Sequence, residues 1–208
     1  MQQLLDTLPS KEQIQTFPVF QNLPMQQIQV INSLEQCHAL EQELKSHAVL
    51  GFDSESKPTF KVGEVSTGPH LIQLATLDKA YLFQMNDSIW DFLKPIFASR
   101  EQIKVGFGLK NDAHLFRKKG IELNSVIELS KCFKAFGLNN PVGLKNAMAL
   151  LFQVNFPKSK RISTSNWASK KLSPAQIDYA AGDAYAPVLS FLLAQFEVLI
   201  RFDLGKFT

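Results

Sequence analysis

The stretch AVLGFDSESKP, residues 48–58, decides the fold of this chain. Its opening residues, Ala48 to Phe52, form an apolar run typical of a buried strand. Asp53 and Glu55 follow two positions apart, and side chains at i and i+2 of a strand point to the same face of a sheet. Two carboxylates therefore project together from the end of a buried strand.

The pair Asp53 and Glu55 needs a compensating charge if it is buried. Two unpaired anions would repel and raise each other's pKa, so the pattern favours bound cations or a shared proton. The alternative is a polar strand end that stands in solvent.

Outward from this stretch, strands and helices alternate. A helix is predicted over 34–44 with Ser33 as its N-cap, and further helices over 89–97 and 109–119. The three residues 77–79 separate two apolar runs by a spacing that suits a hairpin. We therefore expect an α/β fold with a mixed sheet and helices on both faces. The predicted strands are 28–32, 48–52, 70–76, 80–84, 103–107 and 125–129.

The chain divides into an N-terminal extension, residues 1–24, and one domain, residues 25–208. The extension is Gln-rich and interrupted by Pro9, Pro18 and Pro24, which suits an extended arm outside the core with room for one short helix. Residues 58–69, with two prolines and two glycines, are expected to form a flap beside the acids.

Composition excludes several classes of protein. The 208 residues are 45% hydrophobic and include 17 Phe, which is too apolar for a disordered chain. No window resembles a membrane span and the N-terminus does not resemble a secretory signal, so we expect an intracellular, cytoplasmic protein without membrane contact. The two cysteines are interpreted as reduced thiols. The net charge of +3 permits an anionic partner without requiring one.

Two further segments carry acids. KVGFGLKNDAHLF, residues 104–116, predicts a strand followed by a helix with Asp112 on its first turns; its glycines fit neither dinucleotide nor P-loop spacing. LSPAQIDYAAGDAYAPVLSF, residues 172–191, predicts a helix on which Tyr179 and Asp183 share a face. A kink or break is expected at Pro187. The structural alternatives are a helix-dipole partner for Asp112 and a Tyr–Asp hydrogen bond on an exposed face.

Together, four acids and a tyrosine on three elements suit two divalent metal ions. Mg²⁺ and Mn²⁺ prefer oxygen ligands, and two such ions can stabilise both oxygens of a phosphodiester displacement. The three segments resemble motifs I, II and III of the DEDDy branch of 3′–5′ exonucleases, which contains ribonuclease D and the Werner-type exonuclease domain. The resemblance covers residues 28–197 and is most specific over 163–186.

The resemblance implies a ribonuclease-H-like fold, two metal ions and release of nucleoside monophosphates from a 3′ end. It also implies that Asp53 bridges both metals and that Glu55 and Asp183 complete one metal shell. Asp112 would hold the second metal through water, and Tyr179 would orient the attacking water. His114 stands where the Werner-type domain has an indole side chain, so stacking on the terminal base is in question there, and a helix-surface role is the alternative.

Substrate contacts are expected from a basic loop, residues 157–172, in which Asn166 and Trp167 stand among lysines and Arg161. Such a loop could follow a phosphate backbone and stack on a base, whereas the alternative anchors Trp167 in the core. Lys57 could add positive potential, and Gln73 could line the site. The basic residues of this loop are Lys158, Lys160, Arg161, Lys170 and Lys171.

We therefore predict a metal-dependent 3′–5′ exonuclease acting on nucleic acid with a free 3′ end. The chain is too short for an added helicase or the helical domains of ribonuclease D, which favours a stand-alone form and, slightly, DNA over RNA. The alternatives are a catalytically inactive nucleic-acid-binding module and a hydrolase of small phosphate esters.

Overall fold

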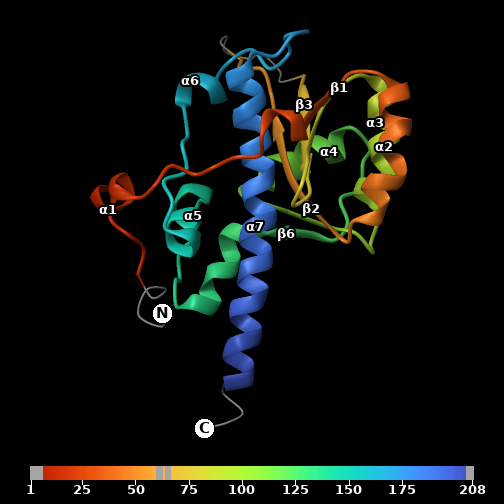
Figure 1. Ribbon diagram of the computed structural model, residues 1–208. Helices are drawn as coiled ribbons and strands as arrows, with labels where there is room; N and C mark the ends of the chain where they lie inside the picture. The colour runs from red at the N-terminus through yellow and green to blue at the C-terminus, as the bar shows by residue number, and fades with distance from the viewer. Residues whose placement is uncertain (1–6, 60–62, 64–66, 205–208) are drawn as a thin grey trace.

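In the computed structural model, which describes residues 7–59, 63 and 67–204, one mixed sheet forms the centre of the fold (Figure 1). Its strand order is β1-β4-β3-β2-β5-β6. Each predicted strand is confirmed, and β2 continues through both acids of the opening motif. The strands are β1 (Ile28–Ile31), β2 (Val49–Glu55), β3 (Leu71–Ala75), β4 (Ala80–Gln84), β5 (Ile103–Gly106) and β6 (Val126–Glu128).

Strand β2 lies between β3, to which it is antiparallel, and β5, to which it is parallel. The predicted hairpin joins β3 to β4 as an antiparallel pair, and the backbone N–H of Thr76 donates to the carbonyl of Lys79 at 2.9 Å. The outer pairs, β1 with β4 and β5 with β6, are parallel. Because β2 is central, its last residues meet elements from both halves of the chain.

The helices alternate with the strands and then follow them. Helix α2 begins after Ser33, whose hydroxyl accepts from the backbone N–H of Gln36 as predicted. The α-helices are α1 (Lys11–Thr16), α2 (Leu34–Ser46), α3 (Asp87–Ala98), α4 (Lys110–Lys118), α5 (Leu144–Phe152), α6 (Lys160–Ser163) and α7 (Pro174–Leu204). Two 3-10 helices are η2 (Met25–Gln27) and η3 (Leu129–Phe136).

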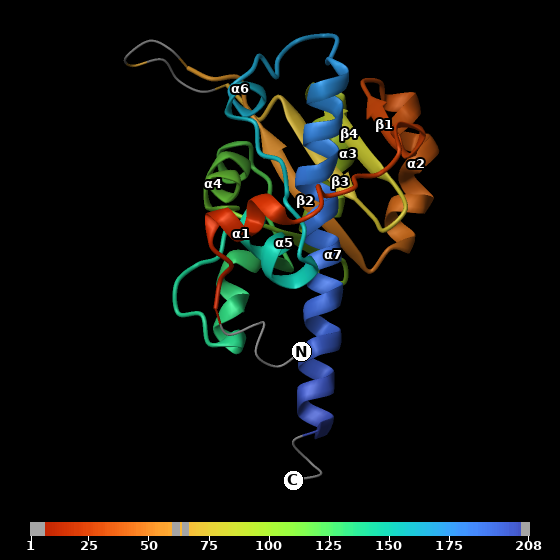
Figure 2. The ribbon, with the colours of Figure 1, turned by 60° about the vertical axis from the view of Figure 1, so that its left-hand side comes forward.

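The two faces of the sheet carry different cores. On one face, Phe52 and alternate residues of β3 and β4 pack with the apolar sides of α2 and α3 and with Phe116 of α4. On the other face, Leu71 and Leu82 pack with the small residues Ala180 and Ala184 of α7. Figures 1 and 2 show α7 running along this second face. The predicted α/β layering, with helices on both faces, is confirmed.

The N-terminal segment is not outside the core. Ile14, Phe20 and Leu23 are 2%, 9% and 7% exposed, and Phe20 packs against Phe156. The prolines of this segment end its helix, but the apolar residues between them are free to pack on the domain. Residues 1–6 of the predicted extension lie outside the described residues.

Helix α7 does not break at Pro187, where a kink or break was expected, but continues to Leu204. Small side chains before the proline pack α7 against the sheet, and the helix continues although Pro187 cannot donate a backbone hydrogen bond. Residues 60–62 and 64–66 of the expected flap lie outside the described residues. Among the described residues, no helix combines the length and apolarity needed to span a bilayer.

Candidate active site

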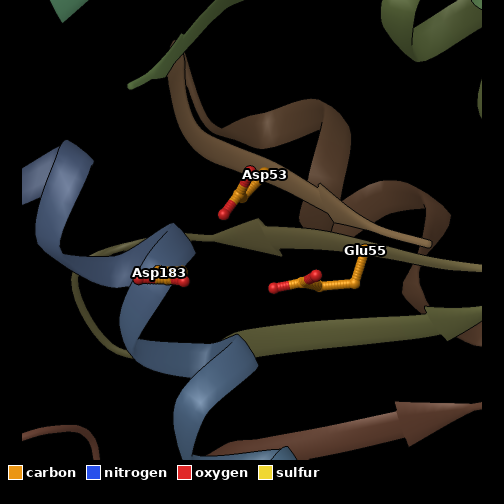
Figure 3. Close-up of side chains that lie close together, drawn as sticks. All are labelled: Asp53, Glu55 and Asp183. Atoms are coloured by element: carbon orange, nitrogen blue, oxygen red, sulfur yellow. The ribbon is translucent and has the colours of Figure 1, made fainter. Parts of the chain in front are cut away.

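Three acids converge where α7 crosses β2. Asp53 and Glu55 occupy one face of β2, and Asp183 projects from α7 toward them (Figure 3). One carboxylate oxygen of each lies within 4.8 Å of the others. Asp53 and Glu55 are half-buried, whereas Asp183 is only 3% exposed. The arrangement offers oxygen ligands from two elements to a common centre.

The electrostatics of this cluster favour a cation. Burial, followed by the charges of Asp183, Asp112 and Glu55, raises the pKa of Asp53 well above its usual range. Burial and the charge of Asp183 raise the pKa of Glu55 to about 8. Burial also raises the pKa of Asp183, against the opposing effect of Lys158. A divalent ion would remove this repulsion, because it favours the charged form of each carboxylate.

Asp112 is linked to β2 by a hydrogen bond from Ser54, the residue between Asp53 and Glu55. It is buried on the first turn of α4, and the Ser54 hydroxyl donates a short hydrogen bond to its Oδ1. Burial raises the pKa of Asp112, whereas the bond from Ser54 lowers it. The charge of Asp112 also acts on Asp53, so the fourth predicted acid belongs to the same electrostatic site.

Tyr179 precedes Asp183 by one turn of α7, as predicted. Burial and the negative charges of Asp183 and Glu55 raise the pKa of its phenol, which therefore stays protonated and can donate a hydrogen bond. Trp167 packs behind it, with ring centroids 6.0 Å apart, and is 1% exposed. The Trp167 indole N–H donates to the carbonyl of Ser163 at 3.1 Å. In this structure Trp167 is packed as a core anchor, the alternative expected for it, and its ring is not exposed to a base.

The other predicted substrate residues divide by exposure. Lys57 and His114 are exposed, on the segment after β2 and on α4. Arg161 and Asn166 are also exposed and line a cavity of about 310 Å³ beside the start of α7. Gln73 is fully buried. The four exposed side chains are accessible to a substrate, whereas Gln73 is not.

Buried polar atoms of Gln73 and Asp183 indicate whether the cluster fits a metal ion. Gln73 is paired in register with Asp53, so both side chains share the face that α7 covers. Neither amide atom of Gln73 has a hydrogen-bond partner among the described residues. Oδ1 of Asp183 also accepts no hydrogen bond there, and its ion pair with the Lys158 ammonium is 3.3 Å long. Buried polar atoms without partners are rare, and a hydrated divalent ion would satisfy them. The donor set, all oxygen, fits Mg²⁺ or Mn²⁺.

Residues 28–193 match the family described as 3′–5′ exonuclease. The chain belongs to the 3′–5′ exonuclease family. This exonuclease domain is 31% identical over 153 residues to the bifunctional 3′–5′ exonuclease/ATP-dependent helicase WRN of Mus musculus, covering 69% of the chain and 10% of that protein. It spans between about a tenth and a half of the length of the first three curated relatives it matches.

Solved structures support the same fold for this exonuclease domain. The Aedes aegypti Nibbler EXO domain has a TM-score of 0.72 at 22% identity, over 84% of this chain and 90% of that chain. Trypanosoma brucei RNase D in complex with RNA U12 has a TM-score of 0.68 at 17% identity, over 86% and 63%. The expected ribonuclease-H-like fold is confirmed.

Two residues of the exonuclease site were not singled out from the sequence. Ser54 is the residue between the two acids of β2, and alternation along the strand predicts that it points away from them. Lys158 was included only as one of several lysines in a basic loop. Its ammonium lies 3.3 Å from Oδ1 and 3.4 Å from Oδ2 of Asp183. The run of basic residues in the sequence indicated this loop. Only the folded structure shows that Lys158 is a residue of the loop that contacts Asp183.

Proposed function

We propose that this domain hydrolyses the 3′-terminal phosphodiester of a nucleic acid by a two-metal mechanism and releases a nucleoside 5′-monophosphate. The observation that carries the proposal is the convergence of Asp53, Glu55 and Asp183 within 4.8 Å. Tyr179 stands one helical turn from the cluster, and Asp112 joins it through Ser54. These are the five residues expected from the sequence, now supported by their common location.

Asp53, Glu55, Asp112 and Asp183 would hold two divalent ions, Mg²⁺ or Mn²⁺. When bound, such ions lower the pKa of a water ligand and neutralise charge on the phosphate oxygens. The water gives up a proton as its oxygen bonds to phosphorus, the bond from phosphorus to the 3′ oxygen of the preceding nucleotide breaks, and that oxygen takes up a proton to leave a 3′ hydroxyl. No oxidant or reductant is required.

Tyr179 would orient the attacking water. Its protonated phenol can donate one hydrogen bond and accept another, so it can fix a water molecule in line with the bond that breaks. It has no carboxylate to offer a metal, and its role is therefore separable from metal binding. Lys57, His114, Arg161 and Asn166, whose side chains are exposed, would contact the substrate, and the buried Gln73 would line the site beside Asp53.

The proposed substrate class is a DNA or RNA strand with a free 3′ end. Trypanosoma brucei RNase D was solved with RNA, whereas the WRN protein combines its exonuclease with a helicase. The slight preference for DNA expected from the sequence stays a prediction. RNA and DNA differ at one hydroxyl group, so the choice rests on a few contacts near the 3′ nucleotide.

The direct test uses 5′-labelled single-stranded DNA, single-stranded RNA and a recessed duplex, each incubated with Mg²⁺ or Mn²⁺. We expect progressive shortening from the 3′ end, which EDTA and Asp53→Ala abolish. Asp91→Ala is the matched control, because Asp91 is exposed on α3 and pairs only with Lys94 among the described residues. Tyr179→Phe should reduce the rate while metal binding is retained.

Other outcomes distinguish the alternatives. Binding without shortening, across all metals and lengths, would support an inactive nucleic-acid-binding module. Hydrolysis of mononucleotides in preference to oligomers would indicate a phosphate-ester hydrolase. Loss of metal binding in Tyr179→Phe would contradict the water-orienting role of this residue.

A further inference from the structure

Lys158 places a positive charge beside Asp183, at the solvent-facing edge of the acid cluster. Its ammonium contacts both carboxylate oxygens of Asp183 and lies 6.0 Å from the centroid of the Tyr179 ring. It lowers the pKa of Asp53 and Glu55 as well as that of Asp183. The Lys158 side chain is 44% exposed, so it borders both the buried acids and the solvent from which a substrate arrives.

The backbone before Lys158 is held by the N-terminal segment, of which residues 18–23 form what we call the strap. The N–H of Asn155 donates to the carbonyl of Pro18 at 2.8 Å, and the N–H of Phe20 donates to the carbonyl of Asn155 at 3.0 Å. The rings of Phe20 and Phe156 lie 5.1 Å apart. Lys158 follows this fixed segment by two positions, which limits where its side chain can reach.

The same strap is attached to α7 beside Tyr179. The side-chain amide of Asn22 donates to the carbonyl of Asp178 at 2.7 Å and to its Oδ1 at 3.0 Å. A cavity of about 320 Å³ lies between the strap and α7, and Tyr179 is part of its lining. The strap therefore contacts both the segment that precedes Lys158 and the turn of α7 that carries Tyr179.

An ammonium group in this position suits a phosphate oxygen. It has three donors, and Asp183 occupies only part of that capacity. Divalent ions on the carboxylates would weaken the attraction between Asp183 and Lys158, while a bound phosphate would present a new anion nearby. Charge-assisted hydrogen bonds to phosphate are among the stronger contacts that a protein makes.

We propose that Lys158 is a further catalytic residue of this exonuclease and that its ammonium donates to a non-bridging oxygen of the 3′-terminal phosphate. The inference rests on the proposed function and adds a residue that contacts the reacting group. Such a contact strengthens as negative charge develops on the phosphate oxygens during displacement.

The test compares Lys158→Met and Lys158→Arg with Lys145→Met, a matched control at an exposed lysine on α5, outside the basic loop. Steady-state kinetics at saturating Mg²⁺ give kcat and KM separately on the oligonucleotide that the wild type degrades. Calorimetry with Mg²⁺ measures the affinity for a nucleoside 5′-monophosphate and for the same nucleoside without phosphate.

We expect Lys158→Met to lower kcat on the order of 10²-fold, as removal of one oxyanion donor does in other enzymes. Its affinity for the monophosphate should fall by roughly tenfold, a typical loss for one charged hydrogen bond, while the nucleoside affinity is unchanged. Lys158→Arg should recover part of both losses, and Lys145→Met should match the wild type.

An unchanged kcat with an unchanged monophosphate affinity in Lys158→Met would overturn the inference. An equal loss of nucleoside and monophosphate affinity would also overturn it, since that result indicates a structural role. If the wild type degrades no oligonucleotide, the proposed function fails by itself. The two calorimetric affinities would then still decide whether Lys158 contacts phosphate.

Discussion

Gly51 on β2 lies directly beneath the carbonyl oxygen of Ala184 on α7, so closely that a Cβ built on Gly51 would collide with that oxygen. The side chain missing from Gly51 allows the helix to approach the strand at this crossing. Asp53 follows Gly51 by two residues on the same face, and Asp183 precedes Ala184. The close approach of the two backbones therefore sets the spacing of the acids.

Gly51→Ala should push α7 away from β2 and separate Asp183 from Asp53. Overpacking of this kind typically costs about 1–3 kcal/mol, which we expect as a lower free energy of unfolding in urea. Mn²⁺ binding, followed by the electron paramagnetic resonance of the free ion, should weaken as well. Gly143→Ala is the control, because a Cβ at Gly143 meets no atom within 4 Å. Equal Mn²⁺ affinity in both variants would contradict this account of the acid spacing.

Ser54→Ala should loosen Asp112 without touching the three-acid cluster. The Ser54 hydroxyl bond lowers the pKa of Asp112, so its loss should make that carboxylate harder to ionise and a weaker metal ligand. We expect the Mg²⁺ concentration for half-maximal rate to rise several-fold, with a modest effect on stability of about 1 kcal/mol. Ser46→Ala is a matched control, since its hydroxyl donates to the Glu43 carbonyl at the surface. An unchanged Mg²⁺ dependence in Ser54→Ala would mean that the Ser54 hydrogen bond does not prepare Asp112 for metal binding.

The core of this fold was predictable because its signals are local. Apolar runs bounded by turn residues marked each strand, and the i, i+2 and i, i+4 spacings placed Asp53 with Glu55 and Tyr179 with Asp183 on common faces. These periodicities depend only on the backbone geometry of one element. The prediction that the acids converge then rested on the resemblance of the three motifs to those of a known family.

What the sequence did not reveal depends on contacts between distant segments. Ser54 and Asp112 are 58 positions apart, and Lys158 and Asp183 are 25 apart. No periodicity relates such positions, so Lys158 could not be distinguished from the neighbouring lysines as the partner of Asp183. The burial of Phe20 was missed for the same reason, because its partner Phe156 belongs to a segment far from it in the sequence.

Asp53→Asn should stabilise the metal-free protein and remove its response to metal. The carboxylate of Asp53 is held among other anions, and the neutral amide relieves that repulsion while keeping a similar shape. In EDTA we expect a higher Tm than for the wild type. Mg²⁺ or Mn²⁺ should raise the Tm of the wild type, since ligands of the native state stabilise it, but not that of the variant. Asp91→Asn should behave as the wild type, and a metal-dependent Tm in Asp53→Asn would contradict the assignment of Asp53 as a ligand.

Glu128 fixes the loop from which α4, the carrier of Asp112, begins. Its Oε1 accepts from the N–H of Gly108 at 3.0 Å and of Ser130 at 3.1 Å, and its Oε2 accepts from the N–H of Leu109 at 2.7 Å. Burial raises the pKa of Glu128, but these hydrogen bonds outweigh burial, so the pKa lies below its usual value. The charged carboxylate is therefore the form that stabilises the fold.

Because the pKa of Glu128 is lower in the folded chain, its contribution is fully present above the unfolded value of about 4.3 and is lost as the pH falls through the folded pKa. Glu128→Gln should lower the free energy of unfolding at pH 7 by about 1.5–3 kcal/mol, the usual range for hydrogen bonds to a charged group. The difference from the wild type should shrink below about pH 4, as urea unfolding at a series of pH values would show. Glu122→Gln, at an exposed position, should have little effect at any pH. A difference that stays constant down to pH 3 would mean that the charge of Glu128 does not hold the start of α4.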